Sequence, residues 1–130
     1  MTEDFFGKYN WDGKTILIVE DDISSIFYLK EILKETGADL LIAEDGERAI
    51  RFCTENPEID IVLMDIQLPI LNGYETTRQI KTNSPHLPVI AQTAYALPEE
   101  RNRCLAAGCD DYISKPINPF EILAMIQKFL

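Results

Sequence analysis

Histidine, cysteine and positive charge are scarce in this 130-residue sequence, and no apolar run approaches the roughly 20 residues that a membrane-spanning helix needs. Lysine and arginine number 12 against 22 aspartates and glutamates, so the net charge is −10 and we expect no direct nucleic-acid binding. The three cysteines are odd in number, and the single histidine cannot complete a zinc site with them. We therefore expect buried thiols in a reducing cytoplasm, and a partner that is a protein or a cation.

The first 14 residues show neither helical nor strand periodicity, and we interpret residues 1–14 as a leader or linker. Their acidic residues and short apolar part exclude a secretory signal. Trp11 is expected to pack on the edge of the domain that follows. Residues 15–130 have the length of one domain with a single core.

From Thr15 onward, short apolar runs alternate with helical patterns. The apolar runs predict strands over 15–19, 39–43, 59–64, 88–92 and 112–114. The helical patterns lie over 23–37, 46–56, 73–83, 98–108 and 119–130. This (βα)5 alternation predicts an α/β fold in which helices cover both faces of a five-stranded parallel sheet, a three-layer α/β/α sandwich.

Four of the five predicted strands end in polar side chains: Glu20 and Asp21 follow the first strand, Asp65 the third, Thr93 the fourth and Lys115 the fifth. In a doubly wound sheet of order 2-1-3-4-5, the first and third strands are neighbours at the switch point, so their carboxylates converge. Carboxylates this close need a cation to remain ionised together. Oxygen ligands suit Mg²⁺, whereas the absence of nearby histidine or cysteine disfavours zinc.

Lys115 and Thr93 supply the remaining chemistry of this predicted site. Pro116 biases Lys115 away from helical geometry, so a loop presents the ammonium. That ammonium can pair with Asp65 at rest and with an added phosphoryl group later, and the Thr93 hydroxyl can donate to a phosphoryl oxygen. Each residue alone also fits an ordinary role, such as an acidic turn, a helix-entry residue or a solvated lysine. Their joint occurrence at strand ends favours phosphoryl transfer to a carboxylate.

The motifs at these strand ends resemble those of the receiver domain of two-component response regulators. They are ILIVEDD at 16–22, VLMDIQLPILNG at 62–73, QTA at 92–94 and DYISKP at 111–116, and the resemblance runs over 15–130. It implies a flavodoxin-like receiver domain whose phosphodonor is a histidine kinase or a histidine phosphotransfer domain. It also implies that Asp65 is the phospho-acceptor, and that Glu20, Asp21, Asp65 and the backbone carbonyl of Gln67 organise Mg²⁺.

The resemblance assigns further roles around the acceptor. Lys115 would contact the phosphoryl group, Thr93 would hydrogen-bond it, and Tyr112 would be the switch aromatic. Phosphorylation would then shift the surface formed by the fourth helix, the fifth strand and the fifth helix. Gln67 and Tyr95 occupy positions that modulate hydrolysis of the acyl phosphate, and a bulky Tyr95 is expected to shield the site from water.

The sequence departs from the family pattern at Glu20, where many members have aspartate, and the extra methylene would let Glu20 hold the metal through water. Two rival classes fit less well. A haloacid dehalogenase-like aspartyl-phosphate hydrolase calls for a second aspartate where Gln67 stands. A flavodoxin-like cofactor binder needs a phosphate-cradling loop after the first strand, where this sequence has three acidic residues, 20–22.

The last predicted helix carries a wide apolar band, which indicates either a homodimer through the fourth helix, fifth strand and fifth helix or cover by the N-terminal aromatics. No effector region follows Leu130, so we interpret the chain as a stand-alone regulator or as the receiver of a hybrid histidine kinase. Either would lie in the cytoplasm or on the cytoplasmic side of a membrane. The expected activities are self-phosphorylation from a partner and slow autodephosphorylation, those of a signalling module and not of a metabolic enzyme.

Overall fold

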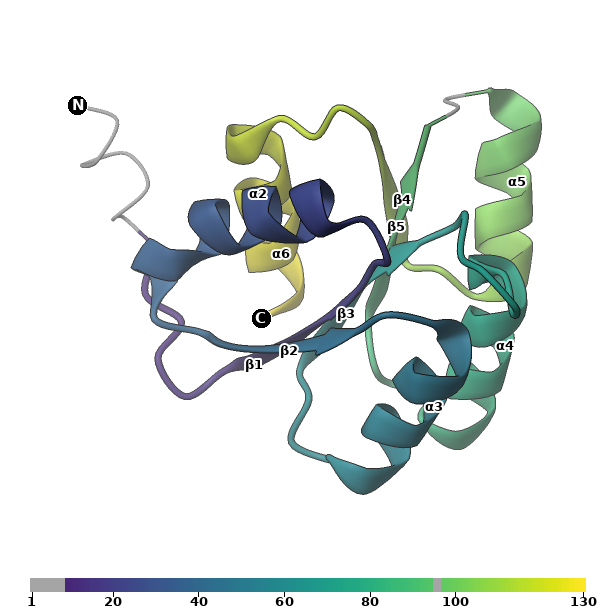
Figure 1. The fold of residues 1–130 in the computed structure, drawn as a ribbon, viewed down its shortest axis with the longest axis horizontal. Helices are drawn as coiled ribbons and strands as arrows, with labels where there is room; N and C mark the ends of the chain where they lie inside the picture. Colours follow the sequence, from purple (N-terminus) through teal and green to yellow (C-terminus); the bar gives the residue numbers. More distant parts are fainter. Residues whose placement is uncertain (1–8, 95–96) are drawn as a thin grey trace.

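A five-stranded parallel sheet forms the centre of the computed structural model, which describes residues 9–94 and 97–130 (Figure 1). Its strands are β1 (Thr15–Val19), β2 (Asp39–Ala43), β3 (Ile61–Asp65), β4 (Val89–Thr93) and β5 (Asp111–Ser114). They lie in the order β2-β1-β3-β4-β5, and every neighbouring pair is parallel. The predicted doubly wound, flavodoxin-like α/β fold is therefore confirmed.

Helices cover both faces of this sheet. Figure 1 shows α2 (Ile23–Leu33) and α6 (Pro119–Phe129) on one face, and α3 (Gly46–Glu55), α4 (Gly73–Asn83) and α5 (Pro98–Ala107) on the other. A short 3₁₀ helix, η1 (Lys34–Thr36), continues α2, so the helix predicted as far as Gly37 is α-helical only to Leu33. None of the helices among the described residues is long and apolar enough to cross a membrane.

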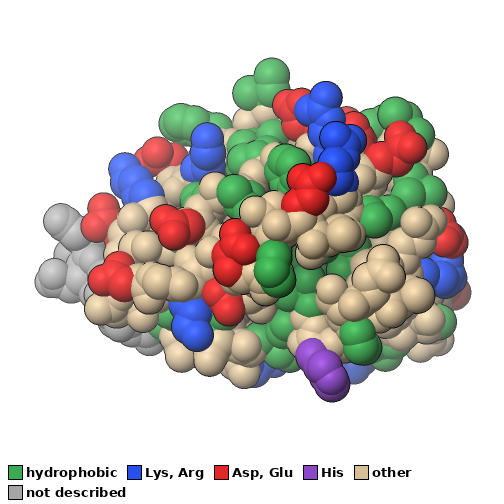
Figure 2. Space-filling model, turned by 90° about the horizontal axis from the view of Figure 1, so that it is seen from below, with side chains coloured by type: hydrophobic (Ala, Val, Ile, Leu, Met, Phe, Trp, Pro, Cys, Tyr) green, Lys and Arg blue, Asp and Glu red, His purple; other side chains and the backbone are tan. Residues whose placement is uncertain are grey.

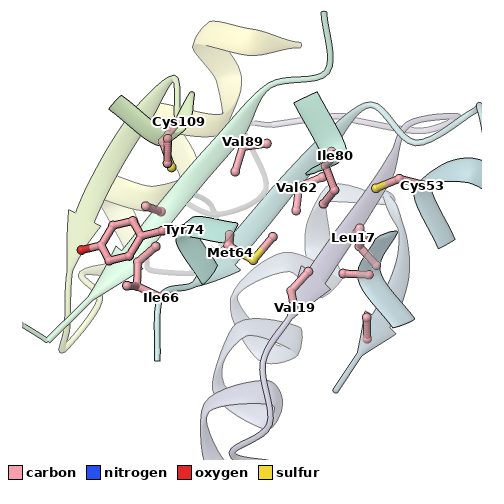
Figure 3. Close-up of a cluster of buried hydrophobic side chains, with 14 of the residues drawn as sticks. Leu17, Val19, Cys53, Val62, Met64, Ile66, Tyr74, Ile80, Val89 and Cys109 are labelled. Atoms are coloured by element: carbon pink, nitrogen blue, oxygen red, sulfur yellow. The ribbon is translucent and has the colours of Figure 1, made fainter. Parts of the chain in front are cut away.

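The central strands are buried along their whole length because helices cover them on both sides. Leu17 and Val19 of β1 belong to the core on the α3–α5 face, whereas Ile16 and Ile18 belong to the core on the α2–α6 face. Figure 3 shows the first of these cores, with Met64 of β3 among the labelled side chains. Full burial of each such side chain stabilises the fold by about 1.5–3 kcal/mol.

A polar residue caps the N-terminus of most of the helices, close behind the preceding strand. The side chain of Asp22 accepts from the N–H of the third helical residue of α2, and Asp45 and Asn72 do the same for α3 and α4. Asn118 accepts from two N–H groups at the start of α6. Each cap typically contributes about 1 kcal/mol. The caps fix where the chain turns from strand to helix, and those turns carry the functional side chains.

Trp11 packs into the core instead of on its edge, and only 3% of it is exposed. Its backbone N–H donates to the Thr36 carbonyl at 2.7 Å, and its indole Nε1–H donates to Oε1 of Gln127 in α6 at 2.7 Å. Part of the apolar band of α6 is thus covered by the N-terminal segment, which was one of the two alternatives for that band. The division at Lys14 between linker and domain stays a prediction.

Charged side chains of both signs are interspersed on the face shown in Figure 2. The single histidine, His86, is exposed (purple in Figure 2). All three cysteines are free and buried, as expected.

Candidate functional site

The predicted site lies at the carboxyl edge of the sheet, where β1 and β3 are direct neighbours. Val19 pairs with Met64 in the parallel register, so Glu20 and Asp65 follow as neighbours. The chain leaves β1 for α2 on one face and leaves β3 for α4 on the other face. This reversal is the topological switch point of the sheet, the place where doubly wound folds bind ligands.

Three carboxylates converge at this point. Glu20, Asp21 and Asp65 each offer one oxygen, and these oxygens lie within 4.8 Å of one another. Glu20 is 1% exposed and Asp65 is 5% exposed, whereas Asp21 is exposed to solvent. The structure thus brings together the acidic residues that the strand ends predicted, with one of them open to solvent.

Lys115 reaches into the acidic cluster from the connection between β5 and α6. Its Nζ lies 3.0 Å from Oε1 of Glu20 and 3.6 Å from Oδ1 of Asp65. Its backbone N–H donates to the Thr93 carbonyl at 2.8 Å, which ties the end of β4 to this connection. The sequence had predicted a pair with Asp65, but the shorter contact is with Glu20, whose longer side chain reaches the ammonium.

These contacts set the ionisation of the site. Burial raises the pKa of Glu20 to about 7, and the adjacent Asp65 carboxylate adds to the rise while Lys115 opposes it. Burial lowers the pKa of Lys115, but the hydrogen bond to Glu20 and the charge of Asp65 outweigh burial, and the pKa is raised overall. Glu20 and Asp65 therefore share the Lys115 ammonium, and the burial of Glu20 and its proximity to Asp65 both disfavour its charged form.

Close backbone packing holds Asp65 in place. Its Oδ1 accepts a hydrogen bond from the Gln67 N–H at 3.1 Å. The first residue of α4, Gly73, donates its N–H to the Ile66 carbonyl at 3.0 Å. A Cβ atom on Gly73 would lie 2.5 Å from the Asp65 carbonyl oxygen and 2.6 Å from the Ile66 Cα. The sequence placed Gly73 only at the start of a predicted helix, whereas the structure shows that glycine permits this approach.

The other predicted site residues lie on β4, on β5 and in the loop that follows β3. Thr93 is buried at the end of β4, and Gln67 is exposed in the loop after Asp65. Tyr112 is half-buried on β5 and packs on the α3–α5 face of the sheet. It lies two residues before Ser114, which pairs with Thr93. The Arg101 guanidinium lies 5.8 Å from the centroid of the Tyr112 ring. Tyr95 lies outside the described residues, and its role stays a prediction, as do the roles of the others.

Sequence reasoning missed a second aromatic beside the site. Tyr74 of α4 is buried, and with Thr93 and Arg103 it lines a pocket of about 260 Å³. The Arg103 guanidinium lies 4.3 Å from the centroid of the Tyr74 ring, which joins α5 to α4. The preceding residue, Gly73, could have indicated that Tyr74 is buried. Because Gly73 lets the start of α4 lie close to the end of β3, the next side chain enters the core.

A doubly wound parallel sheet with a buried aspartate, two further carboxylates and a lysine at its switch point defines a class of flavodoxin-like α/β domains with an acidic ligand site. Within this class, the model of the response regulator receiver domain matches residues 16–127. The chain belongs to this family and is homologous to the receivers of hybrid histidine kinases and response regulators. The predicted receiver function in two-component signalling or a phosphorelay is therefore confirmed, and the two rival classes are not favoured.

Known relatives include full-length regulators and much longer kinases. The chain is 41% identical over 112 residues to hybrid signal transduction histidine kinase I of Dictyostelium discoideum, matching 80% of this chain but only 6% of that protein. It is 34% identical over 119 residues to the polar-differentiation response regulator DivK of Brucella anthropi, covering 90% of this chain and 96% of the relative.

Solved structures show the same fold. The receiver domain of sensor histidine kinase PA1611 from Pseudomonas aeruginosa, which holds a magnesium ion in its active-site cleft, superposes with a TM-score of 0.82 at 37% identity, over 90% of this chain and 97% of that one. The receiver domain of Ssk1 from Saccharomyces cerevisiae, in complex with the histidine phosphotransfer protein Ypd1, gives a TM-score of 0.79 at 26% identity, over 92% and 88% of the two chains.

Proposed function

We propose that Asp65 accepts a phosphoryl group from a phosphohistidine of a histidine kinase or a histidine phosphotransfer domain in a Mg²⁺-dependent reaction. The observation that carries this proposal is the position of Asp65 at the end of β3, between Lys115 and the carboxylates of Glu20 and Asp21. A phosphotransfer partner also agrees with the Ssk1 complex, in which a receiver domain is bound to such a protein.

The residues of the site fit Mg²⁺. Their ligand atoms are oxygens, which this hard cation prefers, and the oxygens of three carboxylates lie within 4.8 Å of one another. Glu20, Asp21, Asp65 and the backbone carbonyl of Gln67 would hold the ion. When bound, Mg²⁺ would offset the negative charge of the phosphoryl oxygens. The receiver domain of PA1611, a protein of the same fold, holds magnesium in its active-site cleft.

The chain's own residues position the reaction. The Gln67 N–H and the Lys115 ammonium lie on the Oδ1 side of Asp65 and fix the orientation of its carboxylate. An Asp65 oxygen attacks the donor phosphorus in line as the bond from phosphorus to the imidazole nitrogen breaks. Lys115 then pairs with the phosphoryl group, and Thr93 donates its hydroxyl to a phosphoryl oxygen. Positioning and electrostatic stabilisation therefore account for most of the catalysis.

Phosphorylation would be transmitted through Thr93 to the surface formed by α5, β5 and α6. Thr93 and Tyr112 lie on adjacent strands and on the same face of the sheet, so an inward movement of Thr93 opens space for the Tyr112 ring. This is a two-state change in the packing of a loop and an aromatic side chain. Gln67 and Tyr95 set the lifetime of the phosphorylated form. The same surface would form a homodimer, which light scattering with and without beryllofluoride tests.

The chain would act in the cytoplasm, or on the cytoplasmic side of a membrane as the receiver of a hybrid kinase. The chain spans 6% of the length of the Dictyostelium kinase and 96% of the Brucella regulator, so both settings have relatives. Its activities would be self-phosphorylation and slow autodephosphorylation, without turnover of a metabolite.

Intact-mass measurement after incubation with acetyl phosphate and Mg²⁺ tests the proposed acceptor. We expect the parent protein to gain the mass of one phosphoryl group, and Asp65→Asn to gain none because the amide is not a nucleophile for phosphorus. Asp39→Asn is the matched control, because Asp39 is an exposed aspartate at the far end of β2 and should leave phosphorylation unchanged. A phosphoryl group that persists in Asp65→Asn, or none in the parent, contradicts the proposal.

A further inference from the structure

A second pocket, of about 410 Å³, lies on the opposite face of the sheet from Tyr112, between α2 and the connection from β5 to α6. Tyr28 and Leu29 of α2 form one wall, and Lys115, Pro116 and Ile117 form the other. The Tyr28 hydroxyl donates to the Ile117 carbonyl at 2.8 Å and bridges the two walls. Its size is within the range of about 300–1,000 Å³ that small-molecule pockets occupy.

Gln92 of β4 forms the inner wall of this pocket. Its side chain has no exposed area, and neither the carboxamide oxygen nor the carboxamide nitrogen has a hydrogen-bond partner among the described residues. The alternation of side chains along β4 places Gln92 on the α2–α6 face with Ile90, whereas Thr93 lies on the other face. Gln92 is therefore separate from the phosphoryl site, although the two residues are adjacent in sequence.

An unpaired buried carboxamide is unfavourable, and the pocket provides the space in which a partner could satisfy it. A carboxamide offers two donor hydrogens and an acceptor oxygen side by side, so its natural complement is another amide. A charged ligand fits less well. The lysine on the wall is already paired with Glu20, and the pocket has no carboxylate to hold a cation. The remaining walls are largely apolar side chains.

We propose that the pocket between α2 and the β5–α6 connection binds a small, neutral, largely apolar molecule that carries a carboxamide or cyclic amide. The amide of the ligand pairs with the Gln92 carboxamide, and the apolar part lies against Leu29, Pro116 and Ile117. An apolar pocket with one convergent polar group has the composition that is typical of ligand sites. The proposal does not depend on phosphorylation of Asp65.

Titration of the ¹⁵N-labelled full chain with benzamide, followed by NMR, tests this site. We expect saturable shifts that are largest at the backbone amides of residues 24–29, 113–115 and 117. Gln92→Leu keeps the side-chain volume but removes the amide, so benzamide binding should weaken by about tenfold, the effect of losing one or two net hydrogen bonds. Toluene, which has the same ring without the amide, should bind Gln92→Leu at least as well as the parent.

A second variant keeps the test valid if Gln92→Leu alters the core. Ser24 lines the pocket and is exposed, so Ser24→Trp should obstruct the pocket and abolish binding of both probes without disturbing buried residues. The proposal is overturned by equal benzamide affinity in the parent and Gln92→Leu, by shifts that centre on another part of the chain, or by the absence of saturable shifts. It is also overturned by a benzamide-soaked crystal in which only ordered water contacts the Gln92 carboxamide.

Discussion

Burial of Glu20 disfavours its charged form, the neighbouring Asp65 carboxylate adds to this cost, and the contact with Lys115 only partly offsets the two. Its pKa rises from 4.5 to about 7 in the folded protein. Because the folded state holds this proton more tightly than the unfolded state does, Glu20 contributes most stability below its unfolded pKa. That contribution is lost as the pH rises through about 7.

Glu20→Gln should therefore stabilise the metal-free protein at alkaline pH but not at acidic pH. Near pH 8 we expect a gain on the order of 2–3 kcal/mol in the free energy of unfolding, since the amide carries no charge, and near pH 5 we expect little change. Urea unfolding with a chelator at the two pH values measures this difference. Glu99→Gln alters an exposed carboxylate and serves as the control. An equal effect of Glu20→Gln at both pH values would contradict the raised pKa.

Gln92 is a second residue at which the fold retains an unfavourable group. Leucine at this position would remove two unpaired polar atoms from the core, so Gln92→Leu should raise the free energy of unfolding by about 1–3 kcal/mol. Urea unfolding in the absence of any added ligand checks this. Gln79→Leu is the matched control, because Gln79 is exposed on α4 and should change stability little. Destabilisation by Gln92→Leu would show that the carboxamide has a favourable partner.

Among the elements, α4 is held against the end of β3 more closely than any side chain would permit. Gly73→Ala places a methyl group 2.5 Å from the Asp65 carbonyl oxygen, so α4 must move away from the strand. We expect a loss of about 1–3 kcal/mol of stability and slower phosphorylation by acetyl phosphate, because the loop that orients Asp65 ends at Gly73 and would shift with α4. Urea unfolding and time-resolved intact mass measure the two effects.

Gly108→Ala separates backbone strain from damage to the site. Gly108 ends α5 with a φ of 105°, and the space around it is bounded by the flexible Lys81 side chain. Alanine there should lower stability by about 1–2 kcal/mol through left-handed backbone strain alone. The phosphorylation rate should remain that of the parent. If Gly73→Ala also leaves the rate unchanged, the close approach of α4 does not position Asp65.

The elements themselves were predictable because each depends on local signals. Apolar runs marked β1 and β2 to the residue, and the helical patterns marked the first residues of α2 to α6. The start of β3 was predicted two residues early, because Ile59 is buried before the strand begins. Convergence of Glu20, Asp21 and Asp65 followed from the order of the strands. The positions of the strand ends did not indicate which carboxylate lies closer to Lys115. That choice depends on how far each side chain reaches from its own loop toward the ammonium.

At the scale of the whole molecule, contacts between segments that are far apart in the sequence were the hardest feature to predict. Gln92 lies in a motif whose visible signal is the neighbouring Thr93, so nothing in the sequence indicated a separate pocket on the other face. The N-terminal segment lacks periodicity, yet it joins the start of the chain to its last helix through Trp11 and Gln127. Tyr9 packs beside Trp11 with ring centroids 5.4 Å apart. A segment without secondary structure can still belong to the core.

Trp11 therefore provides a test of whether residues 9–14 belong to the cooperative unit. Trp11→Ala should lower the free energy of unfolding by about 3–5 kcal/mol, the usual result of removing a large buried aromatic. Trp11→Phe and Gln127→Ala each remove the indole hydrogen bond and should cost about 1 kcal/mol. The double variant should cost less than the sum of the two, because both changes remove the same interaction. Urea unfolding followed by far-ultraviolet circular dichroism measures all four variants. Tryptophan fluorescence cannot be used, because the Trp11 variants lack the only tryptophan. A loss well below 1 kcal/mol in Trp11→Ala would mean that the segment detaches before the domain unfolds, and that the folded unit begins at β1.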